Sequence, residues 1–192
     1  MPRSRKNISP QTRPLRALAN RNEILARLQA ALAAGDGVGG AHCIHELWMR
    51  GEIGSNIEIA LEQLWAATRG NVPDWLPMRH IPWLPGAYDA TARFTRARRG
   101  RHNIYLVLLD YRDSRDDPYG VYVGMSRYTP AERFEQHKAG IRAAGSVLQR
   151  GLEVLAGPTL HLQQMARGEA ELVEERLAEV LRAQGLLVHG GH

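Results

Sequence analysis

Residues 119–137 place tyrosines, a helix start and two basic side chains next to one another. The first half alternates β-branched and aromatic residues between glycines, which predicts a short strand that stops at Gly124. The second half predicts the start of a helix. Thr129 can cap this helix, Pro130 suits the first helical position, and Glu132 stands three residues after the cap, as in a capping box.

Two side chains of this expected helix could bind an anion. Arg133 and His137 lie four residues apart, so both fall on one helix face. They also lie near the helix N-terminus, where free backbone N–H groups and the helix dipole favour negative charge. A strand that carries tyrosines beside a helix face that carries arginine and histidine suits a phosphate group.

An ordered set of motifs in residues 103–188 resembles the GIY-YIG nuclease family. Tyr105 stands in an Asn-Ile-Tyr tripeptide like the family's first motif, with Asn103 where the family has glycine. Tyr122 stands in a Tyr-Val-Gly tripeptide like the second motif, and the helix after it carries the expected arginine, Arg133, and a histidine. The loop between the two tripeptides is longer than in compact members of the family.

The family also has a catalytic glutamate on a later helix, and Glu174 fits its apolar-apolar-Glu context. On that helix Val173, Leu177 and Val180 form an apolar stripe. Glu174 lies at the flank of this stripe, where a carboxylate can reach into a cleft. The alternative is a border residue that extends to solvent. A closing asparagine, usual in the family, is missing from this chain.

The resemblance implies a metal-dependent endonuclease that hydrolyses DNA phosphodiester bonds with one Mg²⁺ or Mn²⁺ ion. Tyr122, held by Tyr105, would orient or deprotonate the attacking water. Arg133 would hold the scissile phosphate by a bidentate contact. Glu174 would bind the metal beside the leaving oxygen, and His137 would relay a proton or grip the phosphate. Because an ordinary tyrosine has a pKa of about 10, the metal and the arginine must lower it, or the tyrosine only orients the water.

Length and composition favour an ordinary folded chain without a membrane partner. The chain has 192 residues, of which 44% are hydrophobic, enough for a core. No apolar run approaches the roughly 18 residues of a membrane span, and no apolar signal core follows the N-terminal arginines. The single cysteine, Cys43, fits a reducing compartment. These features predict a cytoplasmic location.

Positive charge is concentrated in the first half of the chain. Residues 1–102 carry 15 Lys and Arg against 8 Asp and Glu, whereas residues 103–192 carry 10 against 12. Four arginines come just before the first tyrosine strand and a fifth follows the second, and we expect all five to bind nucleic acid: Arg96, Arg98, Arg99, Arg101 and Arg127. The alternative for the cluster is a solvated linker.

The predicted fold class is α+β, with a small GIY-YIG-type sheet flanked by helices and a small helical region before it. We expect four parts along the chain: a basic, disordered arm at 1–19, a helical domain at 20–72, a connector rich in Pro, Trp and Arg at 73–102, and the nuclease-like domain at 103–192.

The expected order in the last part is two strands at 103–110 and 119–124, helices at 130–143 and 146–155, a strand at 159–162 and a helix at 169–183. The loop at 110–118 holds four aspartates with arginines between them. This mixture predicts a solvated hairpin tip in preference to a metal site.

Two alternatives to a DNA endonuclease stay open at this point. The first is a non-catalytic nucleic-acid-binding protein that retains the fold, which the departure at Asn103 and the missing asparagine favour. The second is a nuclease that acts on RNA.

Overall fold

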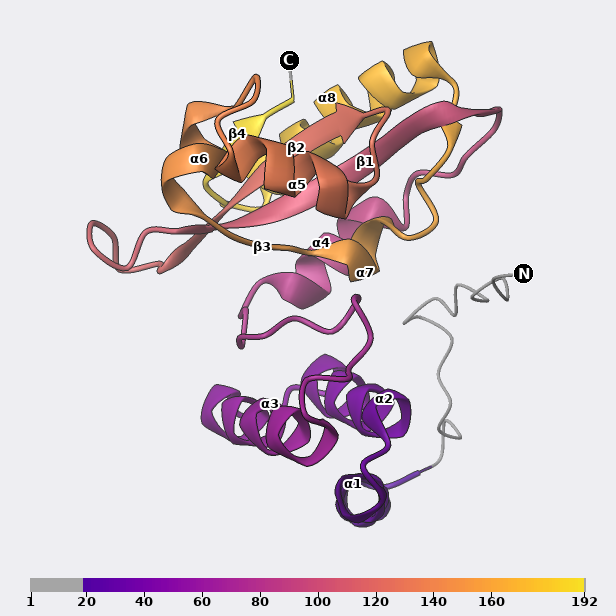
Figure 1. The fold of residues 1–192 in the computed structure, drawn as a ribbon, viewed down its shortest axis with the longest axis vertical. Helices are drawn as coiled ribbons and strands as arrows, with labels where there is room; N and C mark the ends of the chain where they lie inside the picture. The colour runs from indigo at the N-terminus through magenta and orange to yellow at the C-terminus, as the bar shows by residue number, and fades with distance from the viewer. Residues whose placement is uncertain (1–18, 192) are drawn as a thin grey trace. The chain divides into compact units, whose positions relative to one another are not determined.

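The computed structural model describes residues 19–191, in two compact units divided after Pro82. The basic arm predicted at 1–19 lies outside the described residues except for its last residue, Ala19. Ala19 itself is buried, and its carbonyl accepts a hydrogen bond from Arg50. Figure 1 shows the helices of the first unit and the sheet of the second.

The N-terminal unit contains three helices, α1 (Arg21–Ala34), α2 (Gly37–Met49) and α3 (Gly54–Thr68). A capping box between Asn20 and Glu23 begins α1, and Gly35, in the left-handed region with φ 64°, ends it. Buried leucine and isoleucine side chains from all three helices fill the space between them. The predicted helical character of this part is confirmed.

The boundary between the units lies inside the predicted connector. Helix α4 (Leu84–Thr91) carries Pro85 in its first turn and packs against helices of the C-terminal unit. The Trp83 indole N–H donates to the Tyr119 carbonyl oxygen, so this part of the connector belongs with the sheet. Residues 83–102 add five arginines and one aspartate, so the C-terminal unit has a formal charge of +2, not the −2 of residues 103–192.

The C-terminal unit is built on a four-stranded mixed sheet in the order β3-β1-β2-β4. The strands are β1 (Arg99–Asp110), β2 (Tyr119–Ser126), β3 (Gly151–Val154) and β4 (Val188–Gly190). β1 pairs antiparallel with β2 and with β3, and β4 runs parallel to β2. The predicted α+β class, with helices flanking a small sheet, is confirmed.

Helices cover both faces of the sheet (Figure 1). On one face, Tyr105, Val107 and Leu109 of β1 and Tyr122 of β2 pack against α5 (Pro130–Lys138) and α6 (Gly145–Arg150), and we call this the tyrosine face. The intervening residues of β1 and β2 pack on the opposite face against α8 (Arg167–Ala183). This alternation follows from the twofold periodicity of a strand.

Three predicted elements between 130 and 162 were wrong in extent or kind. Helix α5 ends at Lys138 and not at 143, and the strand expected at 159–162 is absent, because a short helix, α7 (Ala156–Thr159), ends there and residues 160–162 form a turn. The helix expected at 146–155 stops at Arg150 because the next residues pair with the edge of β1 as β3. Gly151 permits this sharp change, since a Cβ there would lie 2.5 Å from the Val147 carbonyl oxygen.

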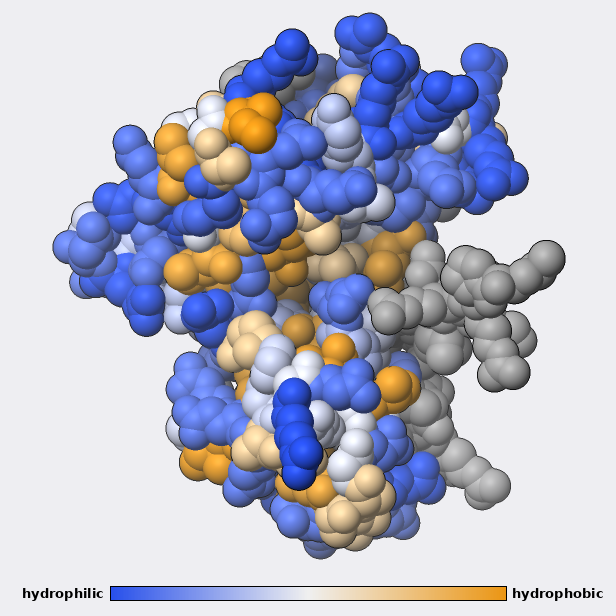
Figure 2. Space-filling view, in the orientation of Figure 1, coloured by the Kyte–Doolittle hydropathy of each residue, from blue (hydrophilic) through white to orange (hydrophobic). Residues whose placement is uncertain are grey.

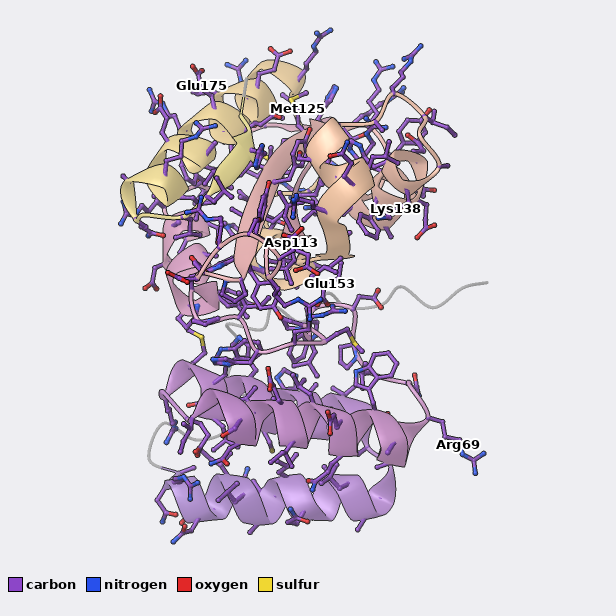
Figure 3. The ribbon with its side chains drawn as sticks, turned by 90° about the vertical axis from the view of Figure 1, so that its left-hand side faces the viewer. Arg69, Asp113, Met125, Lys138, Glu153 and Glu175 are labelled. Carbon is purple, nitrogen blue, oxygen red and sulfur yellow. The ribbon has the colours of Figure 1, made fainter. Side chains whose placement is uncertain are left out.

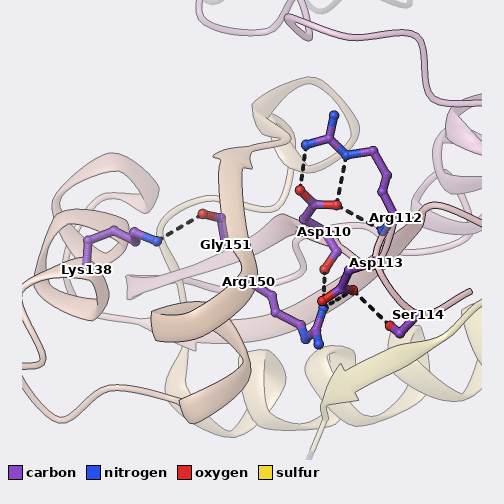
Figure 4. Close-up of polar contacts among 7 residues, drawn as sticks. All are labelled: Asp110, Arg112, Asp113, Ser114, Lys138, Arg150 and Gly151. Carbon is purple, nitrogen blue, oxygen red and sulfur yellow. Dashed lines mark hydrogen bonds and ion pairs between the residues drawn. The ribbon is translucent and has the colours of Figure 1, made fainter.

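The acidic loop is an exposed hairpin tip, as predicted. The Arg112 side chain forms an ion pair with Asp110 at 2.6 Å, and Arg150 forms one with Asp113 at 2.8 Å (Figure 4). Arg150 also lies over the Tyr111 ring, 4.4 Å from its centroid. These contacts anchor the tip at the end of the hairpin opposite to Arg99.

The visible face of the C-terminal unit is mostly hydrophilic, with small apolar patches between the charged side chains (Figure 2). Within residues 19–191, none of the helices combines the length and the apolar character that crossing a bilayer requires.

The tail strand β4 depends on a glycine, and this dependence can be tested. A Cβ at Gly190, where φ is 79°, would lie 1.9 Å from the Val123 carbonyl oxygen, whereas at Gly185, with φ 88°, nothing lies within 4 Å. Both alanine variants carry backbone strain, but only Gly190→Ala also clashes. We expect Gly190→Ala to destabilise β2 by about 2–4 kcal/mol and Gly185→Ala by about 1 kcal/mol.

The measurement is amide hydrogen exchange of β1 and β2, followed by NMR. Equal losses of protection in the two variants would mean that β4 is not docked through Gly190.

Candidate active site

The two motif tyrosines lie side by side because a glycine makes room for them. Tyr105 pairs across the ladder with Gly124, and the Tyr105 and Tyr122 ring centroids are 6.0 Å apart. A Cβ at Gly124 would lie 2.6 Å from the Tyr105 hydroxyl and from the Tyr122 ring. The glycine of the second motif is therefore a steric requirement of the site.

Helix α5 brings its two basic side chains to these tyrosines. Its capping box is present, because Thr129 Oγ1 accepts from the Glu132 N–H at 3.3 Å and the Glu132 carboxylate accepts from the Thr129 N–H at 2.9 Å. Pro130 occupies the first turn. One turn further on Arg133 is half-buried, and after another turn His137 has no exposed surface.

His137 is the centre of a directed set of hydrogen bonds. Its Nδ1 accepts from the Ala144 main-chain N–H at 2.9 Å, so in the neutral ring the proton is on Nε2. Nε2 lies 3.0 Å from the Tyr105 hydroxyl oxygen and therefore donates to it. Burial, aided by the nearby Arg133 charge, lowers the pKa of His137 from 6.5 to about 4. The imidazole is therefore neutral at physiological pH and offers no positive charge to a phosphate.

The two tyrosine hydroxyls are protonated at physiological pH, because burial raises the pKa of both above the ordinary value. Since the His137 Nε2–H donates to the Tyr105 hydroxyl, that hydroxyl can direct its own proton toward the neighbouring Tyr122.

Arg133 is fixed by main-chain oxygens of the loop that follows α5. Its Nη1 donates to the Ile141 carbonyl and to the Gln136 side chain, both at 3.1 Å, and its Nη2 donates to the Arg142 carbonyl at 2.7 Å. Arg142 takes the left-handed conformation with φ 45°, which is uncommon for a residue other than glycine. The guanidinium lowers the pKa of Tyr105 and of Tyr122, against the larger effect of burial.

Glu174 reaches the same place from α8. Its side chain is buried, with 9% of the residue exposed, and the main-chain N–H groups of Met125 and Gly191 lie close enough to its carboxylate to act on its pKa. Burial raises its pKa to about 7, and the neighbouring Glu171 charge adds to this, while the two N–H groups oppose it. Figure 3 shows Met125 at the end of β2, with Glu175 on the outer side of α8. Glu174 is therefore a buried carboxylate and not a solvated border residue.

The chain tail supplies a part of the site that the sequence reasoning missed. β4 pairs with β2 so that His189 lies opposite Tyr122, and the Arg182 side chain donates to the Gly190 carbonyl at 2.7 Å. A Cβ at Gly191 would lie 2.3 Å from the Ala178 side chain, so a glycine is needed for its N–H to reach Glu174. The Gly-Gly pair near the end of the sequence was the available signal.

The structure brings together all five residues predicted to do chemistry. Tyr122 feels the charges of both Glu174 and Arg133, and Tyr105 contacts His137 and Tyr122. The site is thus a pair of hydroxyl groups between a fixed guanidinium and a buried carboxylate. Such a set can polarise a water, neutralise an anion and hold a cation.

The arginines predicted to bind nucleic acid fall into separate groups. Arg99 and Arg101 are exposed residues of β1. Arg96 and Arg98 precede the strand, and the Arg96 side chain donates to the Gln163 carbonyl at 3.1 Å. Arg127 lies near His102, whose pKa is lowered by burial and by the Arg127 charge.

Glu174 fits one hydrated divalent cation. In the described part of the chain no three His, Cys, Asp or Glu side chains gather as a metal cage. Mg²⁺ keeps several waters and is commonly held by one or two carboxylates together with substrate phosphate oxygens, so a single buried carboxylate beside an anion site suits it.

Comparison with protein-family models, with curated proteins and with solved structures finds no match for this chain.

The lowered pKa of His137 leads to a measurable titration. We expect the ring protons of His137 to titrate near pH 4 in an NMR experiment on the folded protein, well below 6.5. The unfolded chain takes up this proton at a higher pH than the folded chain does. The contribution of the neutral His137 ring to the free energy of unfolding is therefore fully present above about pH 6.5. On the order of 2 kcal/mol should be lost as the pH falls from there to 4. Titration of His137 near 6.5 would contradict the hydrogen bonds assigned to its ring.

Proposed function

We propose that this protein is a metal-dependent endonuclease that hydrolyses phosphodiester bonds of DNA by the GIY-YIG type of mechanism. The observation that carries the proposal is that Tyr105, hydrogen-bonded to His137, lies beside Tyr122, and that Arg133 and Glu174 are close enough for their charges to act on Tyr122. Phosphodiester hydrolysis needs a positioned water, neutralised phosphate charge and a stabilised leaving oxygen, and each group of the site supports one of these. A cytoplasmic location remains part of the proposal.

Tyr122 orients the attacking water with its neutral hydroxyl group. Burial raises the pKa of Tyr122, and although the Arg133 charge opposes this, the hydroxyl stays protonated and does not act as the base. His137 fixes the orientation of the Tyr105 hydroxyl beside it, because its Nε2–H donates to that oxygen. Tyr105 and His137 are positioning residues in this account.

Arg133 binds the scissile phosphate. Three hydrogen bonds to the following loop and to Gln136 hold the guanidinium in place in the absence of a ligand. A planar guanidinium held in this way matches the paired oxygens of a phosphate and strengthens as charge develops on them.

Glu174 would hold Mg²⁺ or Mn²⁺, which supplies Lewis-acid stabilisation of the leaving oxygen when bound. The N–H groups of Met125 and Gly191 keep the carboxylate pointed toward the end of β2. Its pKa of about 7 means that proton and metal compete for it near neutral pH.

Substitution of the two central charged residues tests the proposal. Glu174→Gln and Arg133→Lys should each reduce Mg²⁺-dependent nicking of plasmid DNA by about 100-fold or more, because each removes an interaction that strengthens in the transition state. Glu175→Gln is the matched control for the first variant. It lies on the exposed side of the same helix and should cleave at the wild-type rate.

Cleavage by Glu174→Gln at the wild-type rate, with an unchanged circular dichroism spectrum, would contradict the assignment of a GIY-YIG type of mechanism to this site. If the wild-type protein binds DNA but cleaves neither duplex nor single-stranded DNA in Mg²⁺ or Mn²⁺, it is a non-catalytic binding protein. Cleavage of RNA alone would make it a ribonuclease.

Metal affinity should depend on pH through Glu174. The Glu174 carboxylate must be ionised to bind the cation, and its pKa in the folded protein is about 7. The affinity for Mg²⁺ should therefore reach its maximum above that pH. It should fall by about tenfold for each pH unit below it. Calorimetric titration with Mg²⁺ at about pH 6 and about pH 8 measures this. An equal affinity at the two pH values, or a pH dependence retained by Glu174→Gln, would contradict the ligand assignment.

A further inference from the structure

Two exposed arginines of β1 continue the tyrosine face beyond the active site. Alternation along the strand puts Arg99 and Arg101 on the same face as Tyr105. The opposite face at this end of β1 is closed, since a Cβ at Gly100 would lie 2.2 Å from the Met165 carbonyl oxygen. The two guanidinium groups therefore point to the side on which the proposed phosphate site lies.

The strand that carries them is held rigidly. The Gly100 N–H donates to the Gln164 carbonyl at 2.8 Å, and the Ala166 N–H donates to the Arg98 carbonyl at 3.1 Å. The Glu169 carboxylate accepts from the Arg98 N–H at 3.1 Å. Within residues 19–191 neither Arg99 nor Arg101 has an ion-pair partner. Two charges without partners stand on a fixed edge.

An exposed aromatic ring follows the end of β2, the strand that pairs with β1. Tyr128 is 52% exposed, and it directly precedes the residue that caps α5. Its backbone is fixed on both sides, because its N–H donates to Ser126 Oγ at 3.2 Å and its carbonyl accepts from Asn103 Nδ2 at 2.9 Å. Asn103 lies between Arg101 and Tyr105 along the tyrosine face. Tyr128 is thus held next to Asn103, between the arginines and the site tyrosines along the chain of contacts.

We propose that Arg99, Arg101 and Tyr128 form a path that leads an unpaired nucleic-acid strand into the site, an inference that rests on the proposed function. Alternate side chains on a strand are about 6.6 Å apart, a spacing comparable to that of successive phosphates along a nucleic-acid backbone. An exposed tyrosine ring stacks on a base only where that base has left its own helix. The substrate class that fits is a single strand, or a duplex with a single-stranded branch or end.

The same arrangement assigns a role to Asn103. Besides its bond to the Tyr128 carbonyl, its Oδ1 accepts from the Gln164 N–H at 2.9 Å. It therefore joins the loop that carries the aromatic ring to the loop that holds the arginine strand. Asn103 is a positioning residue for the path.

The experiment measures binding with the full-length Glu174→Gln protein, so that cleavage does not interfere. Fluorescence anisotropy with one labelled oligonucleotide, as a single strand and as a blunt duplex, gives affinity across a salt series. Tyr128→Ala should weaken single-strand binding by about 5- to 100-fold and leave duplex binding nearly unchanged, whereas Tyr128→Phe should retain both. A fluorescent adenine analogue in the strand should report stacking in Tyr128→Phe and lose that signal in Tyr128→Ala.

Charge variants test the second half of the path. Arg99→Gln and Arg101→Gln should each flatten the salt dependence of single-strand binding by about 0.7 in slope. The matched control is Arg115→Gln, an exposed arginine at the opposite tip of the hairpin, which should leave the slope unchanged.

Two results overturn the inference while leaving the proposed function intact. One is an unchanged affinity for single strands when Tyr128→Ala is added to the Glu174→Gln protein, while the protein that retains Glu174 cleaves DNA. The other is an equal loss of affinity for duplex and single strand. A wild-type chain that binds neither form would overturn the path and the proposed function together.

Discussion

The buried hydroxyl of Tyr105 is the constraint on which the C-terminal unit depends. A buried hydroxyl without a partner costs about 1–3 kcal/mol, and this side chain is 1% exposed. It is satisfied by His137, which in turn needs the Ala144 N–H on its other nitrogen. The same need fixes the position of α5, the course of the loop after it and the absence of a side chain at Gly124.

This constraint also explains why the loop after α5 is strained. The loop must return to His137 at Ala144, and on the way its carbonyl groups at Ile141 and Arg142 bind the Arg133 guanidinium. The left-handed conformation of Arg142 is compatible with these bonds, which offset its cost of about 1–2 kcal/mol. One conformation of this loop therefore makes the hydrogen bonds of both the histidine and the arginine.

The sequence predicted which side chains come together better than it predicted the strands and the boundary around them. Local signals with a single structural meaning were reliable: the capping box at Thr129, the spacing of Arg133 and His137, and the apolar stripe that places Glu174. β3 and β4 were missed or misassigned because each has only three or four residues and is stabilised by pairing with β1 or β2, which leaves no periodic pattern. The boundary was displaced because Pro85 begins a helix as readily as it interrupts one.

In the sequence, Asn103 departs from the glycine of the family's first motif. In the structure its side chain hydrogen-bonds two loops, a role that residue spacing could not reveal. Tyr122 is central to the proposed chemistry, because it lies beside Tyr105 and the charges of Arg133 and Glu174 act on it. The most direct test is the single-turnover rate of DNA cleavage by Tyr122→Phe, with Tyr119→Phe at the other end of β2 as control. The account predicts a loss of about 100-fold or more for Tyr122→Phe and none for the control. Cleavage by Tyr122→Phe at the wild-type rate would contradict it.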